Sequence, residues 1–270
     1  MPHRPAWAPD DIDIERPAPA RMYDFYLGGS HNFAADRALA AQAMSVWPDS
    51  PHIARANRAF LRRAVAFASA QGIDQFLDLG SGIPTVGHVH EVAAALNPQA
   101  RTVYVDNDAV AFTHSRNLLD GIPNTVALHA DLRDPDAVLA EAGEVLDLGR
   151  PVAVLMFAVL HFVPDEDDPA GVVGAYRDAT PAGSMLAVTH ATNDYEPERL
   201  REMEDVYRSA SAGLVGRSRE QISELLIGYD LVQPGLVSMI EWRPEPDSGP
   251  DPLGGEARRY SAYAAVGLHR

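Results

Sequence analysis

The sequence of 270 residues contains no cysteine and no lysine, so all 22 of its basic side chains are arginines. Without cysteine the chain can form no disulfide, no thiolate nucleophile and no cysteine metal site. Without lysine it has neither a phosphate-loop lysine nor a lysine that could serve as a Schiff base or general base. These absences exclude several common classes of enzyme before any motif is considered.

Long apolar runs are also absent, and no stretch approaches the roughly 20 residues that a membrane-spanning helix needs. The first five residues, M-P-H-R-P, lack the apolar core of a signal peptide. We therefore expect a cytoplasmic protein that does not associate with membranes. The 38 acidic residues give a net charge of −16, and because such a surface repels phosphate backbones, we expect no nucleic-acid partner.

A chain of this length can bury one core with a small appended cap. Prolines at positions 2, 5, 9 and 17 indicate a flexible arm over residues 1–18. A helix is predicted over residues 19–27, ending at Gly28-Gly29, and an alanine-rich helix over residues 33–46, ending before Pro48. Apolar residues near helical spacing predict a third helix over residues 51–70. These three helices would form a cap, residues 19–74, placed before the first strand.

From residue 75 to the C-terminus, apolar strands alternate with helices, which predicts a doubly wound, mostly parallel α/β sheet covered on both faces. The expected strands cover residues 76–79, 102–105, 125–128, 152–157 and 185–189. The expected helices between them cover residues 85–96, 108–119, 135–142 and 169–179. Two further helices, 198–212 and 218–227, precede strands 231–241 and 260–268, which we expect to form an antiparallel hairpin at the sheet edge.

Residues 75–87, Q-F-L-D-L-G-S-G-I-P-T-V-G, carry the clearest local signal. A short strand leads into the turn Gly80-Ser81-Gly82, and a helix is expected to follow. Glycine permits positive φ and a close approach of the backbone to a ligand, while a helix start supplies unpaired N–H groups. Since ligands of doubly wound sheets bind outside the carboxyl ends of the strands, these three residues are predicted cofactor contacts.

Acidic residues stand at the ends of three predicted strands. Asp106 could accept hydrogen bonds from two ribose hydroxyls, although it could instead start the following helix, as Asp108 is well placed to do. Asp131 could contact an adenine amino group, or it could serve only as a turn residue or helix cap. Asp78, just before the glycine turn, is better placed to order that loop than to contact a ligand.

The glycine turn also helps to choose the cofactor. A dinucleotide site needs G-x-G-x-x-G, but Thr85 stands where the third glycine would be. S-adenosylmethionine has no phosphate, and its methionine portion needs only a close backbone approach. The residues therefore favour S-adenosylmethionine over NAD, and no metal-binding pattern is evident.

A catalytic residue is harder to assign. The fourth strand leads through Phe157, which faces the same crevice and is a predicted cofactor contact, to His161. This histidine could act as a general base near neutral pH, but it could equally be a packed core residue. His31 and Asp24 are further candidates, and the general base stays open.

Residues 21–29, R-M-Y-D-F-Y-L-G-G, and 32–37, N-F-A-A-D-R, resemble the opening motif of a bacterial family of S-adenosylmethionine-dependent methyltransferases, long classified as a domain of unknown function. The resemblance continues through residues 57–61, 76–85, 103–108, 151–164 and 263–267. It implies a seven-stranded class I methyltransferase fold, Rossmann-like, whose last strand is antiparallel. It also implies cofactor contacts from Gly80, Ser81, Gly82, Asp106, Asn107, Asp131 and Leu132. Pro84 departs from the wider pattern G-x-G-x-G by replacing its last glycine.

The N-terminal motif could contribute to the site as well. A helix ending at Gly28-Gly29 could bring Tyr23, Tyr26 and Asn32 over the cofactor as a lid, because aromatic faces attract the sulfonium cation. Alternatively, the tyrosines only pack the cap on the sheet. Together the observations predict methyl transfer to a small-molecule acceptor, with a non-catalytic cofactor-binding or regulatory module and an NAD-dependent oxidoreductase as alternatives. The acceptor, its nucleophilic atom and the oligomeric state stay open.

Overall fold

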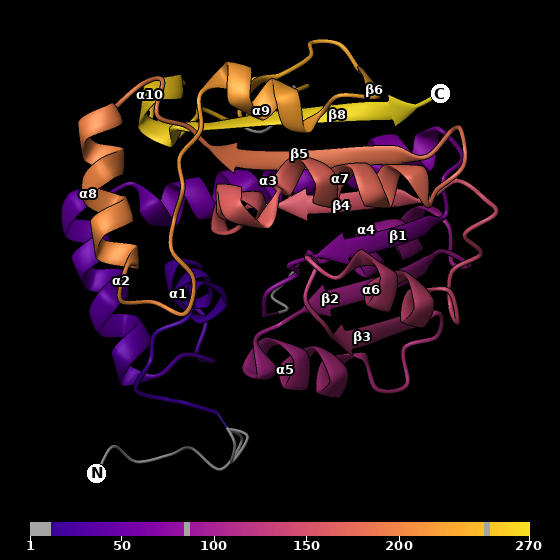
Figure 1. The fold of residues 1–270 in the computed structure, drawn as a ribbon, viewed down its shortest axis with the longest axis horizontal. Helices are drawn as coiled ribbons and strands as arrows, with labels where there is room; N and C mark the ends of the chain where they lie inside the picture. The colour runs from indigo at the N-terminus through magenta and orange to yellow at the C-terminus, as the bar shows by residue number, and fades with distance from the viewer. Residues whose placement is uncertain (1–11, 84–86, 246–248) are drawn as a thin grey trace.

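The computed structural model describes residues 12–83, 87–245 and 249–270. A central sheet carries helices on both faces, and a group of helices lies across one end of it (Figure 1). The chain enters this group first, through α1 (Pro19–Tyr26) and α2 (Ala34–Val46), and continues into α3 (Ser50–Ala70), which packs on one face of the sheet. Within the described residues, none of the helices is both long and apolar enough to cross a bilayer.

The parallel part of the sheet follows the cap. Its strands are β1 (Gln75–Leu79), β2 (Arg101–Asp106), β3 (Thr125–His129), β4 (Ala153–Phe157) and β5 (Met185–Ala191). The connecting elements are α4 (Val89–Leu96), α5 (Ala109–Leu119), α6 (Pro135–Ala142), η1 (Leu160–Phe162), η2 (Asp165–Asp167) and α7 (Pro169–Asp178). The last elements are α8 (Pro197–Tyr207), α9 (Arg219–Leu225), β6 (Tyr229–Leu231), β7 (Val237–Ser238), α10 (Ala257–Tyr260) and β8 (Ala262–His269).

The strands lie in the order β3-β2-β1-β4-β5-β8-β6, and β7 also pairs with β8. Strands β1 to β5 are parallel, whereas β8 runs antiparallel to β5 from Met185↔Leu268 to Ala191↔Ala262. The predicted doubly wound sheet with antiparallel C-terminal strands is therefore confirmed. Because β1 has β2 on one side and β4 on the other, the winding reverses there, which is where such sheets bind ligands.

The prediction of one continuous strand over residues 231–241 is wrong. Two short strands, β6 and β7, replace it, and the turn between them contains Pro234 and Gly235, whose φ is +88°. Proline cannot donate to a sheet ladder, so a strand through this position would lose a hydrogen bond. Both short strands pair with β8, which consequently lies inside the sheet while β6 forms the edge.

Two predicted helices have different bounds in the structure. The helix expected over residues 198–212 ends at Tyr207. The helix expected over residues 85–96 is α4, which begins at Val89, and residues 85 and 86 of the predicted range lie outside the described residues.

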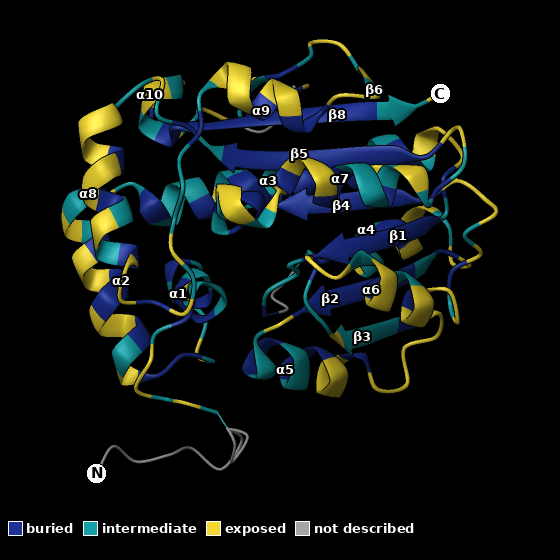
Figure 2. Cartoon of the chain, in the orientation of Figure 1, coloured by how far each residue is buried: buried dark blue, intermediate teal, exposed yellow. Residues whose placement is uncertain are grey.

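Apolar clusters cover both faces of the sheet, and a third cluster joins the two ends of the chain. On one face α3 and α4 pack on the sheet, and on the other face α6, α7 and α9 do so. The third cluster holds Met22 of α1, Leu39 of α2 and Leu200 of α8 together. Figure 2 shows the buried strands between helices with exposed outer faces. Helix α8 thus completes the N-terminal cap from the second half of the chain.

Candidate functional site

A cavity of about 800 Å³ lies between the carboxyl ends of the parallel strands and the cap. The arrowheads of β1, β2 and β4 point towards α1 and α8 (Figure 1). Its volume falls within the range of roughly 300–1,000 Å³ that is usual for small-molecule sites. The lining includes ten residues predicted from the sequence: Gly80, Ser81, Gly82, Asp106, Asn107, Asp131, Leu132, Phe157, Tyr23 and His161.

The glycine turn forms the edge of the cavity at β1. Gly80 and Gly82 have φ angles of +71° and +66°, and the backbone nitrogens of Gly80 and Ser81 donate to the carbonyl of Val105 (2.8 and 3.1 Å). A Cβ added to Gly80 would lie 2.2 Å from Cγ2 of Val159. Both the backbone conformation and this close approach require glycine at position 80.

Asp106 ties the glycine turn to the end of β2. Its Oδ2 accepts a hydrogen bond from the backbone nitrogen of Gly82 (2.7 Å), and its Oδ1 accepts from that of Asp108 (2.8 Å). Burial and the nearby charge of Asp108 raise the pKa of Asp106 to about 6. Asp108, not Asp106, caps α5, because its Oδ1 accepts from the backbone of Val110 and Ala111.

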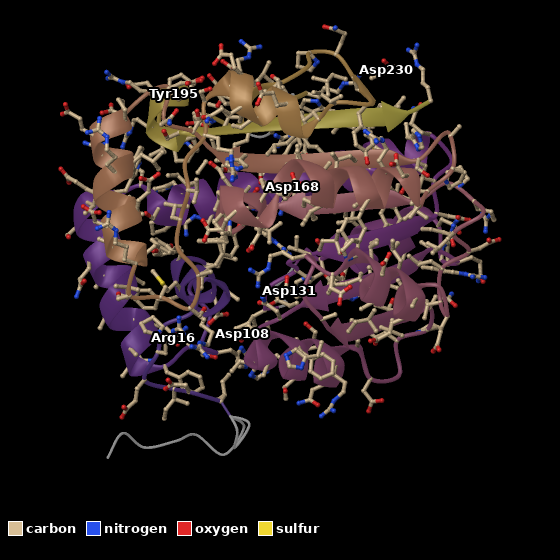
Figure 3. The ribbon with its side chains drawn as sticks, viewed as in Figure 1. Arg16, Asp108, Asp131, Asp168, Tyr195 and Asp230 are labelled. Carbon is tan, nitrogen blue, oxygen red and sulfur yellow. The ribbon has the colours of Figure 1, made fainter. Side chains whose placement is uncertain are left out.

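The end of β3 extends the same side of the cavity. Asp131 forms an ion pair with Arg133 (2.6 Å) and accepts a hydrogen bond from Nδ2 of Asn107 (3.3 Å). The hydrogen bonds from Arg133 lower the pKa of Asp131. The carbonyl of Leu132 accepts from the hydroxyl of Tyr176 (2.9 Å). Figure 3 places Asp131 near the strand ends that face α1, so two acidic strand ends line one wall.

Arg58 of α3 is a cavity residue that the sequence analysis missed. The residue is only 8% exposed, and it lines the cavity. Its Nη2 approaches the carbonyl of Gly87 (3.4 Å) and Nδ1 of His88 (3.3 Å), while its Nε has no hydrogen-bond partner among the described residues. Helical spacing does not reveal which arginine of α3 faces a ligand; its place in the block at residues 57–61 was the available signal.

Asp78 of β1 also lines the cavity and is buried. Burial raises its pKa to about 7, and the positive charge of Arg58 opposes that shift. The sequence analysis favoured a role in ordering the glycine loop over ligand contact for Asp78. The structure places its carboxyl group near the guanidinium of Arg58, and both residues are buried and line the cavity.

Hydrogen bonds connect the cap to the strand ends. The hydroxyl of Tyr23 donates to the backbone of α3 (3.0 Å) and accepts from Nδ2 of Asn57 (2.9 Å). Oδ1 of Asn57 accepts from the hydroxyl of Thr189 (2.7 Å), which accepts from the backbone nitrogen of Ala158 (2.8 Å). Ala158 has a φ of +52°, a conformation that costs a residue with a Cβ about 1–2 kcal/mol. The network therefore holds a strained backbone at the end of β4.

Asp24, His31 and Asn32 lie outside the residues that line the cavity. Oδ2 of Asp24 accepts from the backbone nitrogen of His31 (2.9 Å) and from Nδ2 of Asn32 (2.8 Å). A Cβ on Gly29 would lie 1.9 Å from Oδ1 of Asp24, and Gly28 has a φ of +84°. These residues form the turn between α1 and α2, which accounts for the double glycine of the N-terminal motif.

His161 lies in η1 and lines the cavity. Its Nδ1 accepts a hydrogen bond from the backbone nitrogen of Ala191 (3.3 Å), which assigns the ring proton to Nε2. Burial, with His190 and Arg217 nearby, lowers the pKa of His161 well below its usual value. His190 lies between the carbonyl of Ala191 (2.7 Å) and Nη1 of Arg217 (2.9 Å), and burial lowers its pKa to about 3. His161 is therefore arranged as a neutral hydrogen-bond donor.

With β6 and β7 taken as one interrupted strand, the strand order is that of the class I methyltransferase fold, and the glycine turn and Asp106 lie at its ligand-binding edge. The chain belongs to the S-adenosyl methyltransferase family, whose family model matches residues 5–270. This membership confirms the family recognised from the N-terminal motif and its cofactor, S-adenosylmethionine.

The chain is also similar to solved structures. A candidate methyltransferase from Thermobifida fusca is 39% identical, with a TM-score of 0.90 and coverage of 98% of this chain and 100% of that chain. A DUF574 family protein from Streptomyces avermitilis is 36% identical, with a TM-score of 0.90 and coverage of 96% and 99%. The N-methyltransferase NodS from Bradyrhizobium japonicum is 12% identical over 80% of this chain and 87% of its own, with a TM-score of 0.50, and shows a shared fold alone. Among curated proteins, none matches.

The placement of Asn32 gives the first testable expectation. Asn32→Ala should lower the free energy of unfolding by about 1–3 kcal/mol, because the buried carboxylate of Asp24 loses a donor. It should leave the affinity for S-adenosylhomocysteine unchanged within about twofold, since Asn32 does not line the cavity. Denaturant melts and calorimetric titration measure the two quantities. The exposed Gln42→Ala of α2 is the control, and a large loss of affinity in a stable Asn32 variant would restore the lid hypothesis for this residue.

Proposed function

We propose that this protein is an enzyme that transfers the methyl group of S-adenosylmethionine to a small-molecule acceptor bound in the same cavity. The observation that carries the proposal is the buried pair of Arg58 and Asp78 beside the glycine turn. An arginine whose Nε has no hydrogen-bond partner in the described parts of the chain, with a carboxylate nearby, suits the carboxylate and ammonium groups of an amino acid. S-adenosylmethionine carries both groups, whereas NAD carries neither.

The strand ends suit the nucleoside portion of the cofactor. Asp106 would accept hydrogen bonds from the ribose hydroxyls, and Asp131 with Asn107 would line the adenine. The backbone of Gly80 and Gly82 would lie against the methionine portion, because no side chain intervenes there. The residues present therefore fit all three parts of the cofactor, and these assignments are the site residues that we propose.

When bound, the cofactor supplies an activated methyl group: a lone pair of the acceptor forms the new bond to carbon, the carbon–sulfur bond breaks with its electrons kept by sulfur, and an acceptor proton leaves to water. The protein's own residues hold and orient the two reactants. Positioning of this kind can supply roughly 7–11 kcal/mol without a catalytic side chain. The cap supports the same role, because α1 and α8 line the cavity opposite the strand ends.

Arg58→Met tests the proposal. We expect it to weaken binding of S-adenosylhomocysteine by about 30-fold, the loss expected when a charge-assisted hydrogen bond is removed. Binding of 5′-methylthioadenosine, which has the same nucleoside but no amino-acid tail, should weaken by less than about threefold. Isothermal titration calorimetry measures both. Arg55→Met, at an exposed position of the same helix, is the matched control.

Three outcomes separate the competing functions. Equal losses for the two nucleosides would contradict the assignment of Arg58 to the amino-acid tail. Binding of NAD in place of S-adenosylhomocysteine would contradict the proposed function and favour an oxidoreductase. Formation of S-adenosylhomocysteine from S-adenosylmethionine in the presence of cell extract tests catalysis, and tight binding without turnover would favour a non-catalytic module.

A further inference from the structure

We propose that the acceptor is an uncharged aromatic molecule that carries a hydrogen-bond acceptor, such as a carbonyl oxygen or a ring nitrogen. This inference rests on the proposed function and extends it to the class of substrate. It concerns the part of the cavity beyond the strand ends, which is lined by α1, α8, the segment after α2 and the segments after β4 and β5.

The charges that line the cavity are confined to one part of it. Among the described residues, every charged lining side chain comes from the N-terminal arm, α1, α3, β1, β2 or the segments after β2 and β3. None comes from α8, from the segment that follows it, or from the segments after β4 and β5. We call this uncharged part the acceptor compartment; its largest lining side chains are Tyr26, Trp47, Phe162, Leu200, Met203 and Tyr207.

Two arginines near the boundary of the compartment already make contacts within the protein, Arg21 with carboxylates and Arg16 with a backbone carbonyl. Arg21 pairs with Asp36 (3.1 Å) and lies 3.5 Å from Asp108, and Arg16 donates to the carbonyl of Ala210 (3.4 Å). A charged acceptor would therefore lose its hydration without gaining a counter-ion in the acceptor compartment. Burying an unpaired charge is costly, so the compartment selects uncharged molecules.

The polar atoms of its aromatic residues are engaged within the protein. Nε1 of Trp47 donates to the carbonyl of Arg259 (3.0 Å), and the hydroxyls of Tyr26 and Tyr207 lie 3.2 Å apart. The rings of Phe162 and Tyr207 have centroids 5.7 Å apart. One of the two tyrosine hydroxyls donates to the other, which leaves one O–H for a further partner. Otherwise these residues offer a ligand ring surface, which prefers stacked or edge-to-face contact with another aromatic ring.

His161 supplies the polar contact. Because its Nδ1 accepts from the backbone of Ala191, its Nε2 carries the proton and can donate one hydrogen bond to a ligand. A donor selects a carbonyl oxygen or a ring nitrogen on the acceptor. Because Nε2 of His161 already carries a proton, it cannot take one from the acceptor, so the methylated atom must have an available lone pair without first losing a proton to His161.

The test compares three probes of similar shape and different charge. 2-Acetylnaphthalene is neutral, 2-naphthoate is an anion and 2-naphthylmethylamine is a cation at neutral pH. Titrated into protein saturated with S-adenosylhomocysteine, the neutral probe should bind at least about tenfold more tightly than either charged probe. Its saturated analogue, 2-acetyldecalin, should bind about fivefold more weakly than 2-acetylnaphthalene.

Variants locate the binding. Phe162→Ala should weaken binding of 2-acetylnaphthalene by about fivefold, and Met203→Asp by at least about tenfold. Both should leave the affinity for S-adenosylhomocysteine unchanged within about twofold. Glu202→Ala, on the exposed face of α8, is the control. If Met203→Asp fails to fold, the affinity of Phe162→Ala for 2-acetylnaphthalene tests the location of binding by itself, because Phe162 is at a half-buried position.

The result overturns the proposal if a charged probe binds as tightly as the neutral one, if none of the probes binds, or if Phe162→Ala has no effect. S-adenosylhomocysteine is titrated first, without a probe. If it does not bind, the proposed function fails, and the same probe series on the cofactor-free protein still reports whether the compartment takes uncharged aromatic molecules.

Discussion

Gly80→Ala is expected to abolish measurable binding of S-adenosylhomocysteine, with a loss of affinity of at least about 100-fold. The new Cβ would lie 2.2 Å from Cγ2 of Val159, which is far inside van der Waals contact, so the turn or the end of β4 must move. The φ of +71° adds a cost of about 1–2 kcal/mol for any residue with a Cβ. Calorimetry measures the affinity, and thermal melts establish that the variant is folded.

Two further variants isolate the cause of that loss. Gly28 also has a positive φ, +84°, but a Cβ there would meet no atom within 4 Å, so Gly28→Ala should cost about 1–2 kcal/mol of stability and no affinity. Val159→Ala in the Gly80→Ala background removes the methyl group at 2.2 Å but keeps the Cβ of Val159 at 2.7 Å, so it relieves only part of the clash and should recover no more than about tenfold in affinity. Wild-type affinity in the single Gly80→Ala variant would place the cofactor elsewhere.

The parts of the fold that the sequence predicted are those whose signal is local. A parallel strand buried on both faces must be apolar along its length, and the turn after β1 must contain glycine, so both are visible in a short window of residues. The error over residues 231–241 has a local cause too. The apolar pattern there indicated a strand, but Pro234 and Gly235 impose a turn that outweighs it.

The parts that were missed depend on contacts between distant segments. The cavity-facing position of Arg58 depends on how α3 packs on the sheet, and helical spacing within α3 does not distinguish it from the exposed Arg55. The acceptor compartment requires α8 to pack against α2, elements more than 150 residues apart in the chain. The motif around Asn32 was correctly singled out as distinctive, but its spacing alone could not show that its hydrogen bonds remain inside a turn.

Asp106→Asn is expected to weaken binding of S-adenosylhomocysteine by about 100-fold at pH 8 and by much less at pH 5. The pKa of Asp106 is raised to about 6, chiefly by burial, so the carboxylate is ionised at pH 8 and largely protonated at pH 5. An ionised carboxylate is the stronger acceptor for ribose hydroxyls. The wild-type affinity should therefore decrease as the pH is lowered through about 6. The ratio of the wild-type affinity to the Asp106→Asn affinity, measured by calorimetry across this range, should decrease over the same interval.

Asp106→Asn should be most favourable for stability at high pH, where it is most harmful to binding. Because the folded-state pKa of Asp106 is raised from 3.8 to about 6, its contribution to stability is present below the unfolded pKa and is lost as the pH rises through about 6. Asparagine cannot ionise, so the stability of Asp106→Asn relative to wild type should increase by about 2–3 kcal/mol from pH 4 to pH 8. The exposed Asp136→Asn is the control. A penalty in affinity that is the same at every pH would contradict the role of the carboxylate, because a residue that only shapes the turn would lose the same contacts at pH 5 as at pH 8.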